Sequence, residues 1–213
     1  MSQTFYRAGM VMLFCALVLS FLSSISLPYL PAIDVVRAVG NVGPNEVRWG
    51  IWGVCQYDLS GKRECTHTGH AYEFALVGPD GFEIVGASWT RGLAIHPVAT
   101  GAIAIAFGFA FSKHQSGTLI SSLVSFVSAA ILIIAFAIDI ALFAEVHHVV
   151  GKLDGVSAKV HAGTAFWMTM VSIVLVLLAG FTVCLGRRKE NGNTQSYPMM
   201  SKQDGGFFAR FRR

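Results

Sequence analysis

Charged residues are scarce in this sequence of 213 amino acids. Only 13% of the residues are Asp, Glu, Lys or Arg, against about 25% in ordinary soluble domains. Hydrophobic residues make up 54%, and the mean hydropathy is +0.57. This composition argues against a soluble domain and agrees with a membrane protein.

Motifs for catalysis are also missing. The sequence has no glycine-rich phosphate loop and no His-Glu-x-x-His motif. His67 and His70 near Cys65 suggest a metal site as an alternative, but a disulfide with Cys55 explains Cys65 better. We therefore expect no enzymatic activity, metal, cofactor or small-molecule substrate. No Asn-x-Ser/Thr sequence occurs either, so we expect no N-glycosylation.

Four hydrophobic runs approach or exceed the roughly 20 residues that a helix needs to cross about 30 Å of hydrocarbon. They cover about residues 9–27, 92–111, 119–144 and 162–185. The first is longer than a signal-peptide core, so we expect it to be retained. The predicted fold class is an all-α membrane protein. It comprises a four-transmembrane-helix bundle (1–188) with a small disulfide-stapled extracellular β-sheet in the first outer loop (28–91), and a short disordered tail (189–213).

The distribution of charge predicts the orientation. The segments on the side of both termini carry nine basic and two acidic residues, whereas the opposite side carries seven basic and nine acidic residues. Lys and Arg accumulate on the cytoplasmic side of membrane proteins. Both termini are therefore expected in the cytoplasm. The basic residues are expected to face anionic lipid headgroups rather than nucleic acid.

A cysteine pair marks the first outer loop. Gly50-Ile51-Trp52-Gly53-Val54-Cys55 is followed by nine residues and then Cys65, with Asp58-Leu59-Ser60-Gly61-Lys62 as the turn. Two cysteines ten positions apart meet only if the chain reverses between them, and disulfides persist outside the cell. We expect a disulfide-stapled hairpin with Trp52 as an apolar anchor. Residues 47–57, 72–77 and 82–85 are the expected strands, and residues 41–45 and 78–81 the expected turns.

The other two cysteines fall inside predicted helices. Cys15 is expected to be a small buried residue. Cys184 lies near Arg187 at the inner end of the fourth helix, where packing and palmitoylation are both open. The tail ends with aromatic residues and arginines between Phe207 and Arg213, which suit either the inner leaflet or a trafficking signal.

Asp139 is the one acidic residue inside a predicted span. Because a charge in hydrocarbon is costly, its side chain should face protein or water, or lie near an interface. We place it about five residues from the outer end of its helix. A polar stripe shares its helix face and is expected to point into the bundle: Ser121, Ser125 and Ser128.

Two histidines are candidate partners of Asp139. His96 is followed by Pro97, which suits the first turn of a helix, and His161 begins the fourth hydrophobic run. We hypothesise that one of them pairs with Asp139 and fixes the helix arrangement. The alternative is a carboxylate at interface level that caps or hydrogen-bonds a neighbouring helix. Six histidines are expected on the outer side, by chance or as a response to ambient pH: His67, His70, His96, His147, His148 and His161.

A four-span chain with Gly-Ile-Trp-x-x-Cys-x(9)-Cys in its first outer loop resembles the claudin-like tetraspan superfamily. One departure is that claudins carry a further tryptophan well upstream, and Trp49 is too close to Trp52 to replace it. The remaining similarity is to the fungal SUR/PalI family, and most to its PalI branch. It rests on three segments: Thr90–Ala99, Asp139–Phe143 and Gly163–Thr169.

This resemblance implies a non-enzymatic plasma-membrane protein. PalI-type proteins assist a seven-helix ambient-pH sensor in reaching or remaining at the membrane, so the implied partner is polytopic. The sister branch organises membrane domains and supports cell-wall integrity, which implies self-association instead. Membrane lipids are expected partners in both cases.

Overall fold

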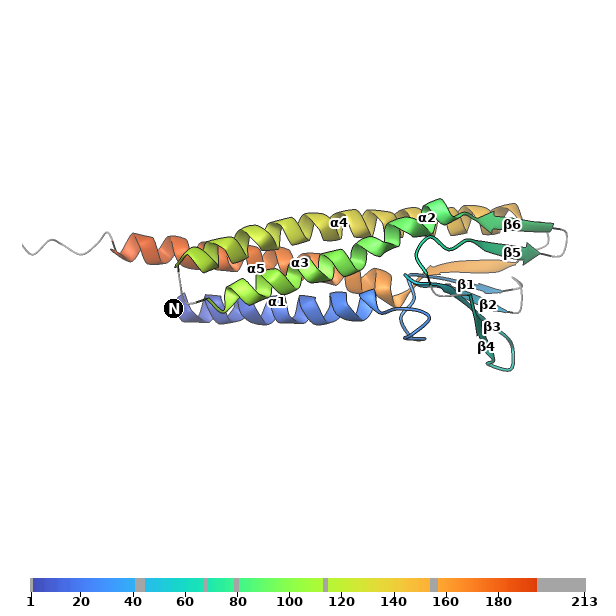
Figure 1. Ribbon diagram of the computed structural model, residues 1–213, viewed down its shortest axis with the longest axis horizontal. Coiled ribbons are helices and arrows are strands. Elements are labelled where there is room, and N and C mark those ends of the chain that lie inside the picture. Colours follow the sequence, from blue (N-terminus) through green and yellow to red (C-terminus); the bar gives the residue numbers. More distant parts are fainter. Residues whose placement is uncertain are drawn as a thin grey trace, which may run out of the picture.

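The computed structural model describes residues 2–40, 45–66, 69–78, 81–112, 115–153 and 157–194, apart from the side chains of 2–6, 115–118 and 183–194. An elongated helix bundle carries β-strands at one end, which we call the sheet end, and the N-terminus lies at the opposite end (Figure 1). The helices are α1 (Ser2–Ser24), α2 (Ala87–Arg91), the 3-10 turn η1 (Gly92–Ala94), α3 (Ile95–Ala110), α4 (Gln115–Lys152) and α5 (Thr164–Thr194).

Four stretches of the described residues are long and apolar enough to cross a membrane. They are Arg7–Ser24, Ala87–Ala110, Leu119–Lys152 and Thr164–Thr182. With the small antiparallel sheet and the Cys55–Cys65 disulfide, they confirm the predicted claudin-like tetraspan fold. The second span is not one helix, because α2 and η1 lead into α3.

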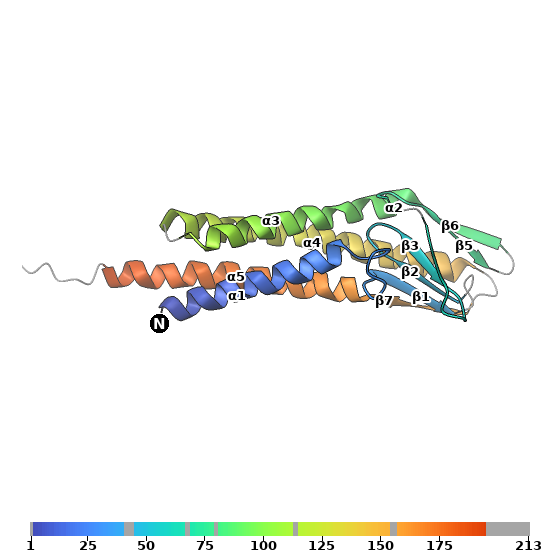
Figure 2. The same ribbon diagram turned by 60° about the horizontal axis from the view of Figure 1, so that its bottom comes forward.

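The helices form a closed ring in which each one packs against two others. α1 contacts α3 and α5, and α4 contacts the same two helices from the other side (Figure 2). Small residues such as Ala16, Ala99 and Ala129 are buried at these contacts. Without a hydrophobic driving force in lipid, such residues favour helix association by letting the backbones approach closely.

Five antiparallel strands form the main sheet, in the order β4-β3-β2-β1-β7. β5 and β6 form a separate hairpin. The strands are β1 (Val36–Gly40), β2 (Glu46–Trp49), β3 (Val54–Tyr57), β4 (Arg63–Cys65), β5 (Phe74–Gly78), β6 (Gly81–Val85) and β7 (Ala158–Ala162).

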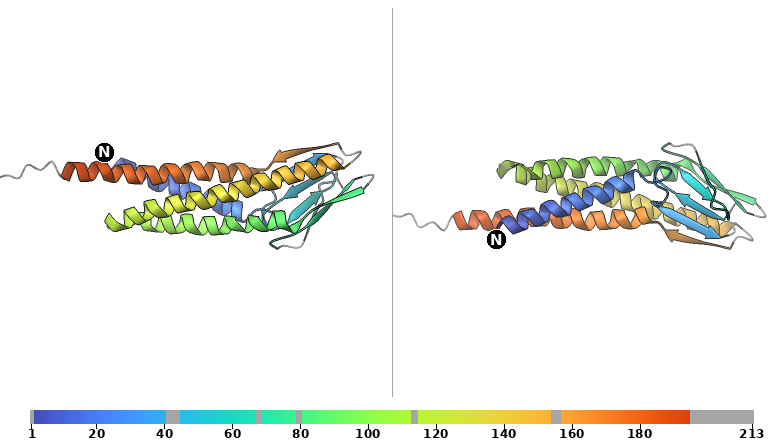
Figure 3. Two further views of the ribbon diagram at one scale, coloured as in Figure 1. Left: turned by 90° about the horizontal axis from the view of Figure 1, so that it is seen from above. Right: turned by 90° about the horizontal axis from the view of Figure 1, so that it is seen from below.

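The last part of α4 supports the sheet. Leu142, Val146, Val149 and Val150 of α4, continued by Leu153 just after it, form an apolar stripe at helical spacing. This stripe belongs to the same core as the buried face of the sheet. Figure 3 shows α4, in yellow, running alongside the strands. The expected helix end at residue 144 is therefore wrong: α4 continues to Lys152, because this stripe has the sheet to pack against.

Strand boundaries differ more from the sequence-based expectations. The expected strand 47–57 is two strands, β2 and β3, separated by residues 50–53. β4 is the second strand of the expected disulfide hairpin, although no bounds were predicted for it. β1 and β7 were not predicted, and β7 occupies residues expected to be a polar connection and the start of a helix. Strand β7 forms by pairing with β1, more than 100 residues earlier, which local pattern does not reveal.

The ends of two other expected features also differ. α5 continues to Thr194, past the expected end of the span at residue 185 and into the segment expected to be a disordered tail. The rest of that tail, including Phe207–Arg213, lies outside the described residues, as do most of the expected turn 41–45 and the middle of the turn 78–81.

Candidate functional site: a polar chain between the hairpin and the helices

The disulfide-stapled hairpin is present as predicted. Cys55 and Cys65 lie opposite each other in the β3–β4 register, with a Cα–Cα distance of 4.0 Å, and form the disulfide. Asp58 Oδ1 accepts hydrogen bonds from the backbone N–H groups of Ser60 and Lys62, both at 2.8 Å, and from the Ser60 hydroxyl at 2.6 Å. The Ser60 hydroxyl is the largest cause that lowers the pKa of Asp58. Gly61 closes the turn at φ +80°, which side chains other than glycine rarely adopt.

Residues 50–53 attach the sheet to the end of α1. The Ile51 N–H donates to Ser26 Oγ at 2.8 Å, and the Trp52 N–H donates to the Leu27 carbonyl at 3.3 Å. A Cβ at Gly50 would collide with Leu27, so glycine is required by this close approach. Gly53 is less constrained, because its Cβ would lie 3.4 Å from Thr66 Oγ1.

Trp49, not Trp52, is the apolar anchor of the sheet. Trp52 is only partly buried, and its Nε1 donates to the Ser24 carbonyl at 2.7 Å. Trp49 is the fully buried anchor, and its ring meets Phe74 edge-on with centroids 6.2 Å apart. Nearby, the buried Tyr72 hydroxyl donates to the Gly50 carbonyl at 2.6 Å, and burial raises the pKa of Tyr72. Trp52 is therefore a polar link more than an apolar anchor.

Hydroxyl groups continue this link from α1 to α3. Thr100 Oγ1 lies 2.7 Å from both Ser20 Oγ and Ser24 Oγ. Ser24 Oγ also reaches the Ser20 carbonyl at 2.8 Å, and Thr100 Oγ1 reaches the His96 carbonyl at 3.0 Å. All of these groups are buried. In hydrocarbon each hydroxyl requires such a partner, so the cluster holds α1 and α3 in register.

A His–Asp pair completes the connection from α3 to α4. His96 Nε2 lies 3.1 Å from Asp139 Oδ1, and the two side chains are 2% and 0% exposed. Asp139 Oδ2 has no hydrogen-bond partner among the described residues. Pro97 follows His96 in the first turn of α3, where a missing N–H costs little. We call the series Trp52, Ser24, Ser20, Thr100, His96 and Asp139 the polar chain.

The structure does not bring His161 to Asp139. His161 lies on β7, is exposed, and stands opposite Arg37 in the β1–β7 register. Asp139 is 13 residues before the end of α4, not about five, because α4 is longer than expected. Its partner His96 lies on the first turn of α3. The pair is therefore still near the sheet end of the bundle.

The serine stripe of α4 points into the bundle. Ser121, Ser125 and Ser128 are each at most 1% exposed. Ser121 Oγ donates to the Ala106 carbonyl of α3 at 2.9 Å, whereas Ser125 and Ser128 donate to carbonyls of their own helix. Sequence reasoning missed Ser122, whose hydroxyl reaches the Gly180 carbonyl of α5 at 3.3 Å.

A second missed cluster fixes the sheet to α5. Asp34 is fully buried and accepts two hydrogen bonds from Arg37, at 2.8 and 3.0 Å. These hydrogen bonds are the main cause of the raised pKa of Arg37. The Asp34 carbonyl accepts from the Ala165 N–H at 2.8 Å, and a Cβ at Gly163 would collide with Asp34. Asp34 and Gly163 are far apart in sequence, so no local pattern pointed to this junction.

The structure tests the expectation for Cys15 but not those for Cys184 and His67. Cys15 is exposed on α1, not buried, because its side chain faces outward from the ring of helices. The side chain of Cys184 lies outside the described residues, and so does His67. Among the residues that the structure does describe, no group of three or more His, Cys, Asp or Glu side chains could hold a metal ion.

Comparison with known proteins gives one result that identifies the chain. No curated protein matches it. The family model described as the SUR7/PalI family matches residues 3–179, from the first helix through the sheet and the polar chain into α5. This is a family of non-enzymatic membrane proteins. The chain therefore belongs to the SUR7/PalI family.

Proposed function

We propose that this protein is a non-enzymatic plasma-membrane accessory that helps a seven-helix ambient-pH sensor to reach or remain at the membrane, as PalI-type proteins do. Membership of the SUR7/PalI family supports a membrane role of this kind. In this proposal both termini are cytoplasmic and the sheet end is outside the cell.

The observation that carries the proposal is that the polar groups in the bundle form hydrogen bonds within the chain itself. The polar chain and the Ser121 and Ser122 hydroxyls bond to neighbouring helices of the same chain. Large apolar side chains such as Ile105, Leu123 and Val174 are exposed on the helices instead. This arrangement supports a scaffold that presents an apolar surface to lipid and to other helices, not a pathway for a polar substrate.

The charge distribution supports the proposed orientation. Arg187, Arg188 and Lys189 follow the last span at the end opposite the sheet. The sheet end instead includes acidic residues in ion pairs, as in Arg48–Glu46 at 2.8 Å and Lys62–Glu64 at 2.7 Å. Basic residues favour the cytoplasmic side.

Crosslinking in native membranes, followed by affinity purification and mass spectrometry, tests the proposal. A seven-helix protein should be recovered with the intact chain. Its recovery should fall when the chain carries Asp139→Leu. Its surface level should fall both with that variant and when this protein is deleted. If the sensor reaches the surface and signals normally without this protein, the proposal is wrong.

A second candidate is a structural tetraspan that organises membrane domains by self-association. The β5–β6 hairpin favours it, because Val77, Phe82 and Ile84 are 59%, 66% and 50% exposed. Exposed apolar residues on a hairpin mark a potential contact surface. Recovery of crosslinked homo-oligomers without a seven-helix protein, lost on Phe82→Ser, would favour this function over the first.

A further inference from the structure

A groove runs between α1 and α3 on the outside of the helix ring. It consists of two adjoining hollows with volumes of about 520 and 380 Å³. Both are lined by Phe21 of α1 and Thr100 of α3, so they follow each other along the same helix pair. Volumes of this size match those of small-molecule sites.

The deeper part of the groove belongs to the membrane-spanning segments. Its lining comes from Arg7–Ser24 and Ala87–Ala110 only: Leu17, Val18, Phe21, Leu22, Thr100, Gly101 and Ala104. The groove is open at Gly101, because this residue has no side chain and nothing lies within 4 Å of the position that a Cβ would take. In a bilayer this part of the groove would open to lipid rather than to water, so its occupant would be apolar.

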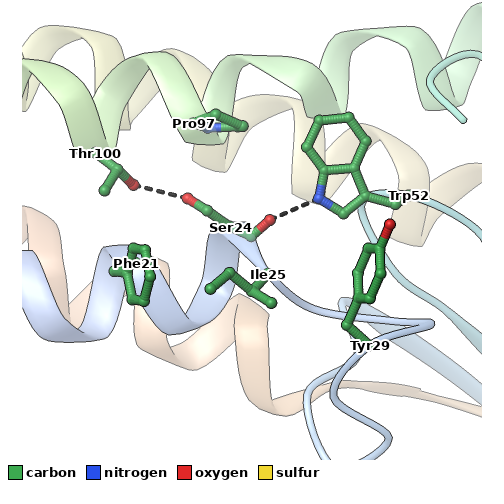
Figure 4. A pocket seen from close by; sticks show the side chains of 7 residues that line it. All are labelled: Phe21, Ser24, Ile25, Tyr29, Trp52, Pro97 and Thr100. Carbon is green, nitrogen blue, oxygen red and sulfur yellow. Dashed lines mark hydrogen bonds between the residues drawn. The ribbon is translucent and has the colours of Figure 1, made fainter.

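The mouth of the groove, at the sheet end, has a different chemistry. Trp52, Tyr29 and Pro97 line it, and the Ser24 side chain and carbonyl lie between Trp52 and Thr100 (Figure 4). Tyrosine and tryptophan are the residues that mark the headgroup level of membrane proteins. An occupant would therefore place its polar end here and its apolar body along α1 and α3.

One polar group at the mouth is free to bind. The Ser24 and Thr100 hydroxyls already bond to each other, and Trp52 Nε1 already bonds to the Ser24 carbonyl. The Tyr29 side chain is 64% exposed, and its hydroxyl has no hydrogen-bond partner among the described residues. Figure 4 shows this hydroxyl directed toward Trp52, over the mouth.

We propose that this groove binds a sterol, with the sterol hydroxyl at Tyr29 and the ring system along Phe21 and Gly101. The lining contains no Lys, Arg, Asp or Glu, so nothing in it recognises a charged phospholipid headgroup. Hydroxyl, indole and phenol groups suit a single uncharged hydroxyl instead. A lining that combines the Phe21 ring with the open position at Gly101 suits a flat, rigid body. The proposal is independent of the accessory role above.

Photocrosslinking of the full-length protein in nanodiscs tests the proposal. A photoreactive sterol should label peptides containing residues 17–25 and 97–104, and unlabelled sterol should compete. Gly101→Leu fills the groove and should reduce this labelling about tenfold or more. Tyr29→Phe removes one hydrogen bond and should weaken competition about threefold to tenfold.

Gly108→Leu is the matched control. Gly108 lies two turns further along the same face of α3, is equally open, and does not line the groove. Its variant should label like the wild type, and size-exclusion profiles should show that both variants fold. The proposal is overturned if Gly101→Leu leaves labelling unchanged. It is also overturned if a photoreactive phospholipid labels the same peptides and sterol does not displace it, because the groove then holds an ordinary acyl chain.

Discussion

His96 and Asp139 form a buried contact between α3 and α4, with Nε2 and Oδ1 3.1 Å apart and almost no exposure to solvent. The His96 carbonyl, the Thr100 hydroxyl and Ser24 connect the same contact to Trp52, which lies just before the stapled hairpin. Three helices and the sheet therefore share one set of polar interactions.

We expect Asp139→Leu and His96→Leu each to lower the free energy of unfolding by about 1–3 kcal/mol, because each leaves a buried polar partner unpaired. The double variant should lose less than the sum of the two single changes. Asp139→Asn keeps the size and a hydrogen-bonding group, so its loss should be smaller. Unfolding in detergent micelles measures all four variants. Strict additivity would show that the two side chains do not stabilise each other.

Cys55→Ser removes the staple of the β3–β4 hairpin. We expect a loss of about 2–4 kcal/mol in stability, and a lower surface level in cells, because the unfolded chain is no longer restrained. Cys15→Ser is the control, since Cys15 is exposed and has no disulfide. Thermal unfolding and surface biotinylation are the measurements. Equal behaviour of the two variants would mean that the disulfide is dispensable.

The two tryptophans should respond differently to substitution. Trp49→Ala leaves a large cavity under the sheet, with an expected cost of about 3–5 kcal/mol. Trp52→Phe retains a ring but loses the hydrogen bond to the Ser24 carbonyl, with an expected cost of about 0.5–1.5 kcal/mol. Thermal unfolding ranks the two. A larger loss for Trp52→Phe would restore Trp52 as the main anchor.

Gly50→Ala should disturb the attachment of the sheet to α1, because the new Cβ would collide with Leu27. We expect a loss of about 1–3 kcal/mol. Gly69→Ala is a matched control in the same region, since nothing lies within 4 Å of that position. Protease digestion of the sheet in folded protein compares the variants. Similar digestion rates would indicate that Leu27 moves aside without cost.

The hairpin turn should loosen in acid. The folded pKa of Asp58 lies below its ordinary value of 3.8, so the charged form binds the turn more strongly. This contribution is fully present above the ordinary value and is lost as the pH falls through the lowered pKa. Amide exchange at Ser60 and Lys62 should become faster over that window after correction for intrinsic rates. Asp58→Asn should remove the dependence, and its persistence in that variant would assign it to another group.

The hydrophobic runs predicted four spans correctly, because a chain segment in lipid has few alternatives to a helix. The ends were harder to predict. Val146, Val149 and Val150 are buried because they pack against the sheet. The sheet was not predicted in that place, so polar neighbours such as His147 suggested a loop. β7 depends on pairing with β1 in the same way.

The candidate site was predictable where side chains alone make the contact. Asp139 and His96 were recognisable because each is a rare polar side chain in an apolar run. Trp52 was predicted as an apolar anchor, but its Nε1 donates to the backbone carbonyl of Ser24, which carries no sequence signal. The same holds for Asp34, whose backbone carbonyl accepts a hydrogen bond from the Ala165 N–H at the start of α5.

The length of α4 has a mechanical consequence. Its 38 residues span about 57 Å at 1.5 Å per residue, almost twice the thickness of the hydrocarbon. The helix is continuous from the serine stripe to the core of the sheet, without a hinge at the membrane surface. A neighbouring protein or a change in bilayer thickness can tilt α4 within the bilayer. Because the helix is continuous, such a tilt is expected to displace the sheet as well.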